Sequence, residues 1–333
     1  MSDYVLSADD EFPHVPDESS NFNESVYVNG FDPERGFGGW MRLGNRVNEG
    51  HAEVQACLYL PDGRIACQFQ RPDIEANTGF SAGPLSYAVH EPLRAVSMKF
   101  DGEFMLLDDP NLLREPRRLF TEAPRVPGSA SFDLVGVSPV HGGAPATDTQ
   151  ETLYGRNFSY GHFFQHTRSD VTLRVGDEQW SFNGGGWRDH SWGPRYWTNI
   201  YYYRLLIANF GPDRAMMLLK ITTRDGITRR HGVLQIDDRY EDITDMDLIT
   251  EWDANKDPVS LQLSVRTAER AVRLDGRVKT LAPLRNRRKV GDETLQCRIA
   301  EGLTEWDWDG QYGIGVTEYI EFLEDGEPVG YPL

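Results

Sequence analysis

The feature that most constrains the fold of this chain is the alternation of short strand-like runs with turns that contain glycine and aspartate. Turn signals recur at residues 61–63, 100–103, 175–180, 209–215, 224–227 and 323–328. Proline presets φ in such turns and glycine tolerates positive φ, so each signal is suited to reversing the chain. The runs between them are rich in Val, Ile, Tyr, Phe and Thr, which favour strands. This pattern predicts an all-β protein built as an antiparallel sandwich or barrel.

Helical signals are few, and the length suggests more than one domain. Residues 109–118 are expected to give one helical turn that Pro116 ends, and residues 122–150 a long loop with at most one strand. A chain of 333 residues is long enough for two domains of ordinary size. We therefore expect an N-terminal arm at residues 1–20, a first domain at 21–182 and a second at 183–333.

Charge and composition restrict the partners. Lys plus Arg number 34 and Asp plus Glu number 52, which gives a formal net charge of −18. A strongly acidic chain repels phosphate backbones and anionic lipid, so nucleic acid is not an expected partner. No apolar run reaches the length of a membrane span, and the N-terminus has no secretory pattern. The three cysteines lack metal-ligand spacing and predict no disulfide framework, so we expect a reducing cytoplasm.

Residues 184–195, with the sequence GGGWRDHSWGPR, hold the densest group of chemically useful side chains. The three glycines let the backbone adopt unusual conformations or pass close to a bulky neighbour. Alternation along a strand would divide the following side chains between two faces: Trp187, Asp189 and Ser191 on one, and Arg188, His190 and Trp192 on the other. Asp189 and His190 offer an acid and a base whose pKa values an apolar pocket would move toward neutrality. In the competing interpretation, Arg188 or Arg195 pairs with Asp189 and joins the two domains.

Glu318 is a second acid/base candidate. By alternation it shares an otherwise apolar strand face with Val316 and Ile320, where partial burial would raise its pKa. The competing interpretation pairs it with an arginine such as Arg204.

Six further residues are candidates for contact with a substrate. They are Trp187, Trp192, Tyr202, Trp40, Arg42 and His162. Residues 36–46 place Trp40 and Arg42 among glycines on a strand expected to face a pocket or an interface. His162 and His166 lie four apart, which on a strand separates them by roughly 13 Å, too far for one metal ion.

The central segment resembles the Gly-x-x-Trp/Tyr-x-Asp-His-x-x-Gly signature of the carotenoid 1,2-hydratase (hydroxyneurosporene synthase) and AttH-like superfamily. The matching positions are Gly184, Trp187, Asp189, His190 and Gly193. The resemblance covers about residues 24–325, with specificity only in this motif, and is strongest to an uncharacterised bacterial branch. Ser191 and Trp192 replace the polar Asn-His-like pair of carotenoid hydratases, so the resemblance does not imply hydration of carotenoids.

The resemblance implies two lipocalin-like antiparallel β-barrel domains packed side by side, with a ligand pocket between or within them. It also implies a cofactor-independent lyase or isomerase: a hydratase, dehydratase or cyclase that acts on an apolar terpenoid, steroid or prenylated molecule. Asp189 would be the general acid or base, His190 would tune it or relay a proton, and Glu318 would be a further acid/base group. The alternatives are a non-catalytic carrier of hydrophobic small molecules, and a scaffold protein. The expected partner is a hydrophobic small molecule, with no metal and no integral membrane association; a homodimer stays open.

Overall fold

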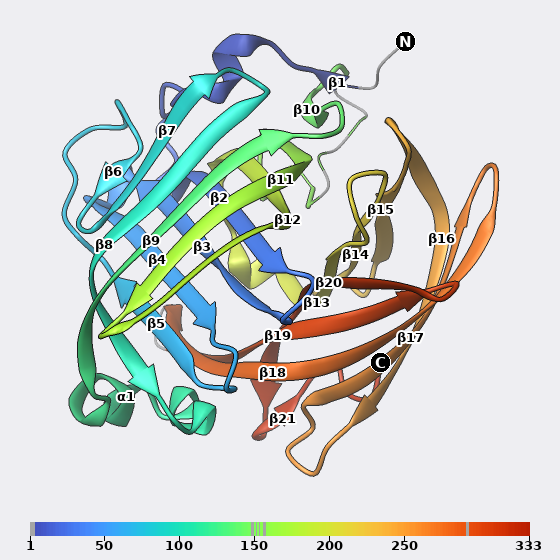
Figure 1. The fold of residues 1–333 in the computed structure, drawn as a ribbon. Helices are drawn as coiled ribbons and strands as arrows, with labels where there is room; N and C mark the ends of the chain where they lie inside the picture. The colour runs from blue at the N-terminus through green and yellow to red at the C-terminus, as the bar shows by residue number, and fades with distance from the viewer. Residues whose placement is uncertain (1–3, 148–149, 151, 153, 156–157, 291–292) are drawn as a thin grey trace.

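The computed structural model describes residues 4–147, 150, 152, 154–155, 158–290 and 293–333 (Figure 1). Strands make up 66% of the molecule and helices 7%, which confirms the all-β prediction. The short helices are η1 (Ala8–Glu11), η2 (Val47–Glu49), η3 (Pro110–Arg114), α1 (Pro116–Glu122) and η4 (Trp197–Asn199). Among the described residues, none of the helices has both the length and the apolar character that a membrane span requires.

The first sheet holds twelve strands in the described part of the chain. They are β1 (Tyr4–Val5), β2 (Phe22–Asp32), β3 (Phe37–Arg46), β4 (His51–Tyr59), β5 (Ile65–Gln70), β6 (Ser81–Ala82), β7 (Leu85–Glu91), β8 (Ala95–Leu107), β9 (Arg125–Gly136), β10 (His141–Pro145), β11 (Gly161–Val175) and β12 (Glu178–Pro194). The strands β11, β12, β2, β3, β4, β5, β8 and β9 close into a ring, because β9 pairs with both β8 and β11.

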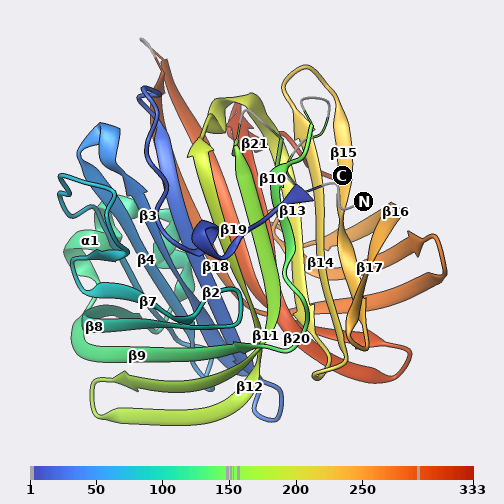
Figure 2. The same cartoon turned by 90° about the horizontal axis from the view of Figure 1, so that it is seen from above.

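The second sheet holds nine strands among the described residues. They are β13 (Ile200–Asn209), β14 (Arg214–Thr223), β15 (Thr228–Ile236), β16 (Arg239–Trp252), β17 (Pro258–Thr267), β18 (Ala271–Val290), β19 (Glu293–Trp308), β20 (Gln311–Glu324) and β21 (Glu327–Pro328). β13 to β20 pair in chain order, and β13 also pairs with β20, which closes an eight-stranded antiparallel barrel. The two barrels lie side by side, as predicted (Figure 2).

Alternation along the strands explains which faces are buried. On β17, buried and exposed positions alternate because only one face meets a core. β2 and β3 are buried at nearly every position, because one face fills the interior of the first barrel while the other meets the second barrel. Val26 and Val28 belong to the interior core, whereas Phe31 and Trp40 pack in a cluster with Val316 of the second barrel.

The expected domain boundary between residues 182 and 183 needs correction. β12 pairs with β11 and β2, so residues 183–194 belong to the first sheet and not to the second. The chain passes from one sheet to the other between Pro194 and Ile200. We propose that the division into domains lies there, with residues 1–20 as an arm that adds β1 and η1 to the first barrel.

Some local predictions also differ from the structure. Five glycines at predicted turns do have positive φ: Gly63, Gly176, Gly211, Gly226 and Gly326. Residues 100–103, however, are not a turn but lie inside β8. Pro116 does not end a helix; it begins α1, because the first helical position needs no N–H donor. The predicted loop at 122–150 contains two strands, β9 and β10.

Candidate active site

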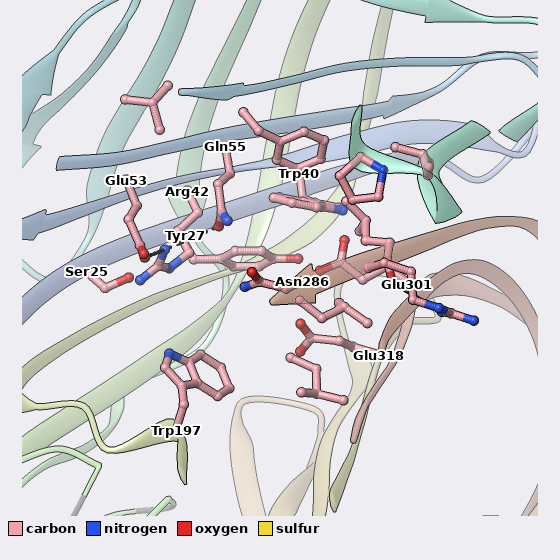
Figure 3. Close-up of a pocket in the computed structure, with 18 of the residues that line it drawn as sticks. Ser25, Tyr27, Trp40, Arg42, Glu53, Gln55, Trp197, Asn286, Glu301 and Glu318 are labelled. Carbon is pink, nitrogen blue, oxygen red and sulfur yellow. Dashed lines mark hydrogen bonds and ion pairs between the residues drawn. The ribbon is translucent and has the colours of Figure 1, made fainter. Parts of the chain in front are cut away.

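A cavity of about 950 Å³ lies between the two barrels. One wall comes from β2, β3, β4, β5 and β12, the other from β13, β18, β19 and β20, and η3 and α1 add to its lining. The residues labelled around it in Figure 3 are Ser25, Tyr27, Trp40, Arg42, Glu53, Gln55, Trp197, Asn286, Glu301 and Glu318. The cavity is therefore built by the outer faces of both barrels, in agreement with the expected pocket between them.

Strand alternation decides which side chains reach the cavity. On β13, Tyr203, Leu205 and Ile207 line it, whereas Leu206 and Ala208 belong to the interior core of the second barrel. The same rule brings alternate residues of β12, β19 and β20 to the cavity.

Two carboxyl groups lie together in the wall of the second barrel. Glu301 on β19 and Glu318 on β20 are direct cross-strand partners, so their side chains leave the sheet next to each other (Figure 3). The hydroxyl of Tyr203 donates a hydrogen bond to Oε2 of Glu318 at 2.6 Å. Burial raises the pKa of both carboxyl groups, and repulsion by Glu318 adds to the effect at Glu301, whose pKa is well above its ordinary range.

The pair therefore keeps a proton under conditions in which exposed glutamates have lost theirs. Two neighbouring carboxylates in a buried site are costly to ionise together, so they share a proton. The positive charge of Arg42 lowers both pKa values, but burial has the larger effect. A protonated carboxyl in such a cavity is a proton donor at pH values above the ordinary range of glutamate, and its conjugate base is an acceptor.

Two arginines extend from the wall of the first barrel. Arg42 on β3 is paired with Glu53 at 3.0 Å. Arg195 donates a hydrogen bond to Oγ of Ser191 at 2.6 Å and lies 4.4 Å from the ring centroid of Phe158. Burial, followed by repulsion from Arg42, lowers the pKa of Arg195 to about 10.

Asp189, the acid predicted from the central motif, also lines the cavity. Its Oδ2 lies 3.8 Å from Nε2 of His162. His162 is buried beside Asp189 and does not line the cavity, contrary to prediction. In the described part of the chain, neither Arg188 nor Arg195 pairs with Asp189. Arg188 pairs with Glu11 instead, at 2.6 Å. The catalytic role of Asp189 stays a prediction.

The proton-relay role expected for His190 does not fit the structure. His190 and Trp192 point away from Asp189 to the other face of β12, which is the division that strand alternation predicts. Nε2 of His190 lies 2.7 Å from Oε1 of Glu24, and Trp192 stacks on His14 with 3.9 Å between ring centroids. Neither residue lies where it could contact a molecule in the cavity.

Trp187 and Tyr202 also lie outside the cavity, contrary to prediction. Trp187 is fully buried between the barrels, where its indole N–H donates to the carbonyl oxygen of Ala208 at 3.2 Å. The ring of Tyr202 lies against the guanidinium of Arg204 at 4.9 Å, and the next residue, Tyr203, takes its place in the cavity because it is on the opposite strand face.

Besides Asp189, three predicted residues line the cavity: Trp40, Arg42 and Glu318. The competing interpretation of Glu318 as the partner of Arg204 is wrong, because Arg204 pairs with Glu321 at 3.0 Å.

The sequence interpretation missed Glu301, although the signal was present. Glu301 alternates with Ile299 and Leu303 on a strand face that is otherwise apolar, which is the argument that identified Glu318. The pairing of the two strands could not be read from the chain, so nothing indicated that these two carboxyl groups meet.

Three potential metal ligands converge away from this cavity. Ligand atoms of His14, Glu24 and His190 lie within 4.8 Å of one another. The carboxylate of Glu24 accepts hydrogen bonds from His14 at 2.8 Å, His190 at 2.7 Å and Asn77 at 2.9 Å. Burial raises the pKa of Glu24, but the hydrogen bonds and charges of the two histidines have the larger combined effect and lower this pKa to about 2. These contacts attach the N-terminal arm to the first barrel.

Solved structures share the two-barrel architecture at low sequence identity. An AttH-like protein from Nitrosomonas europaea is 13% identical, with a TM-score of 0.58 over 95% of this chain and 99% of that chain. CghA is 13% identical, with a TM-score of 0.51 over 99% and 98%. Kievitone hydratase from Nectria haematococca is 9% identical, with a TM-score of 0.57 over 96% and 97%. The likeness confirms the expected AttH-like fold.

At the level of sequence, a family model described as a domain of unknown function, DUF7064, matches residues 7–322. No curated protein matches the chain significantly.

Proposed function

The chain belongs to the DUF7064 family, and from its AttH-like fold we propose that it is a hydratase- or dehydratase-type enzyme that acts on a largely apolar small molecule. The observation that carries the proposal is the buried pair of Glu301 and Glu318, which offers a proton to a cavity between two barrels. The proposal is supported by kievitone hydratase, a protein of the same fold that is named for this class of reaction.

The carboxyl pair supplies both proton transfers of a hydration. The shared proton passes to one carbon of a carbon–carbon double bond, whose π electrons form the new C–H bond and leave a cation on the neighbouring carbon. Water adds to that cation, and the ionised pair removes a proton from the resulting oxonium group. The substrate gains one water and the enzyme recovers its proton. Dehydration is the same sequence in reverse, and ring closure instead of water capture would give a cyclase.

The walls of the cavity suit the cation in this scheme. The rings of Tyr27 and Trp40 stack with 6.1 Å between centroids, and Trp197 lies across the cavity from them (Figure 3). Aromatic faces stabilise a nearby cation through their quadrupole. Ile207 and Ile320 add an aliphatic part to the lining, which suits a reaction that needs few water molecules.

Asp189 is the proposed second acid/base group of the same cavity. Its position on the first barrel, across from the carboxyl pair on the second, suits a carboxylate that orients the attacking water. The terpenoid or prenylated nature of the substrate, a cytoplasmic location and a homodimer stay predictions.

The test is turnover by the purified protein of a prenylated phenol and of the matching tertiary alcohol, in water labelled with oxygen-18. For hydration, we expect the prenylated phenol to give a product heavier by one labelled water. For dehydration, we expect the tertiary alcohol to lose one water. Glu301→Gln and Glu318→Gln should abolish this turnover while both variants still bind the substrate. Variants that turn over at the native rate would remove the carboxyl pair from the mechanism.

A non-catalytic carrier is the second candidate, because a cavity of about 950 Å³ can hold an apolar ligand without chemistry. A carrier would bind both test compounds without turnover, and its affinity would be unchanged in Asp189→Asn and Glu318→Gln.

A further inference from the structure

Arg195 is a buried cation without a carboxylate partner among the described residues. It is only 8% exposed, and it lines the cavity. One terminal nitrogen donates to Ser191, and the guanidinium plane is covered on one side by the ring of Phe158. Its Nε is buried and has no hydrogen-bond partner in the described part of the chain. An arginine therefore reaches the cavity with donor capacity that the described part of the protein does not use.

Neither of the described carboxylates on the same wall forms an ion pair with Arg195. Glu53 pairs with Arg42 at 3.0 Å, and Asp189 lies 3.8 Å from His162. Among the neighbouring charges, that of Arg42 acts most strongly on Arg195, and the two positive charges repel each other. Among the described residues, Arg195 is therefore attracted by Asp189 at a distance but has no carboxylate in direct contact, although the whole chain carries a formal net charge of −18.

A buried guanidinium without a counter-ion is unfavourable, and its planar set of N–H donors matches an oxyanion closely. A neutral oxygen could accept one hydrogen bond but would leave the charge uncompensated. An acidic oxygen group on a ligand would supply both the acceptor and the charge.

We propose that Arg195 binds an anionic oxygen group of the substrate, and that the ligand class is an amphipathic organic acid: a carboxylate, phenolate or enolate on an apolar body. This inference rests on the proposed function only in taking the cavity as the substrate site. The anionic end lies at Arg195 and Ser191, and the apolar body extends along Leu205 and Ile320 toward the carboxyl pair. The overall negative charge of the protein makes such a local cation necessary for an acidic ligand.

The experiment uses two dyes that differ in one anionic group. 8-Anilinonaphthalene-1-sulfonate (ANS) is anionic, and N-phenyl-1-naphthylamine (NPN) is the same molecule without the sulfonate. Both become fluorescent in apolar sites. Their dissociation constants are measured on the native protein, on Arg195→Gln and Arg195→Lys, and on Arg94→Gln. The last is a control that removes the same charge at an exposed residue paired with Glu91.

We expect Arg195→Gln to weaken ANS binding by about tenfold or more and to change NPN binding by less than about twofold. Arg195→Lys keeps the charge but loses the planar set of N–H donors, so it should show a smaller loss of ANS affinity. This variant tests the proposal if Arg195→Gln does not fold. Arg94→Gln should match the native protein. Equal loss of both dyes, no loss of ANS in either Arg195 variant, or no binding of ANS to the native protein would overturn the proposal.

The same dyes separate this inference from the proposed function. Glu301→Gln and Glu318→Gln should keep the native ratio of ANS to NPN affinity while turnover is lost. If turnover survives in those variants but the dye results hold, the reaction proposal fails and the anion site stands.

Discussion

At the scale of single residues, the chemistry depends on one proton shared by Glu301 and Glu318. Glu318→Gln replaces a carboxyl by an amide of nearly the same shape, so it removes proton transfer and keeps the packing. We expect kcat to fall by about 100-fold or more, the usual contribution of general acid/base catalysis. Glu324→Gln, at the exposed end of the same strand, is the matched control and should keep native kcat.

The pH dependence of the reaction follows from the direction of the shift. The active form is protonated and its pKa is raised above the ordinary 4.5, so kcat/KM should be high at low pH and fall as pH rises through the raised value. The hydrogen bond from Tyr203 lowers the pKa of Glu318, so Tyr203→Phe should raise that pKa and move the falling limb to higher pH. A pH profile of kcat/KM in which the limb stays in place or moves down would show that Glu318 is not the titrating group.

Residue-level prediction from the sequence succeeded where alternation along one strand was enough. It correctly separated Asp189 from His190, and it placed Glu318 on a buried face. It could not relate strands to one another, so it did not reveal that His190 meets Glu24 or that Glu301 lies beside Glu318. Cross-strand pairing depends on register between distant segments, which a single sequence does not reveal.

At the scale of elements, β12 depends on Gly184 and Gly186 for close approach to β2, and on Gly185 for close approach to Asn209 of β13. None of the three has positive φ. A Cβ on Gly186 would lie 2.0 Å from the carbonyl oxygen of Asn29, and one on Gly184 would lie 1.9 Å from that of Phe31. Of the two explanations that the sequence allowed, contact with a neighbour is therefore the one the structure supports.

Gly186→Ala should therefore strain the pairing of β12 with β2 and lower the free energy of unfolding by about 1–3 kcal/mol. Urea unfolding of the variant measures this. Gly79→Ala is the matched control, because an added Cβ there meets nothing within 4 Å and should change stability by less than about 0.5 kcal/mol. Equal stability of the two variants would contradict the explanation.

The N-terminal arm is an element whose anchor is a buried ion pair. Glu11 of η1 binds Nη1 of Arg188 at 2.6 Å, and it also accepts hydrogen bonds from the hydroxyl of Tyr87 at 3.0 Å and the backbone N–H of Leu93 at 2.7 Å. Glu11→Ala would leave Arg188 buried and unpaired, so we expect a loss of about 3–5 kcal/mol in guanidinium unfolding. Asp9→Ala, at an exposed position of the same helix, should have little effect. A Glu11→Ala variant as stable as the native protein would show that the arm is not anchored in this way.

At the scale of the whole molecule, function depends on how two barrels face each other. The all-β class could be predicted from the turns, and the two barrels from the resemblance of the central motif. The position of the boundary could not, because β12 carries the motif yet pairs with β2, more than 150 residues earlier in the chain. The cavity could not be predicted either, because its walls are the outer faces of two barrels and no local sequence pattern encodes how the barrels are oriented relative to each other.

The central claim is that a carboxyl pair between the barrels keeps a proton at neutral pH. Infrared spectroscopy tests it directly, because a protonated carboxyl has a carbonyl stretch that a carboxylate lacks. At pH 7 the native protein and Asp189→Asn should both show this band, and the double variant Glu301→Gln/Glu318→Gln should lack it. A native protein without the band at pH 7, or a double variant that retains it, would contradict the claim.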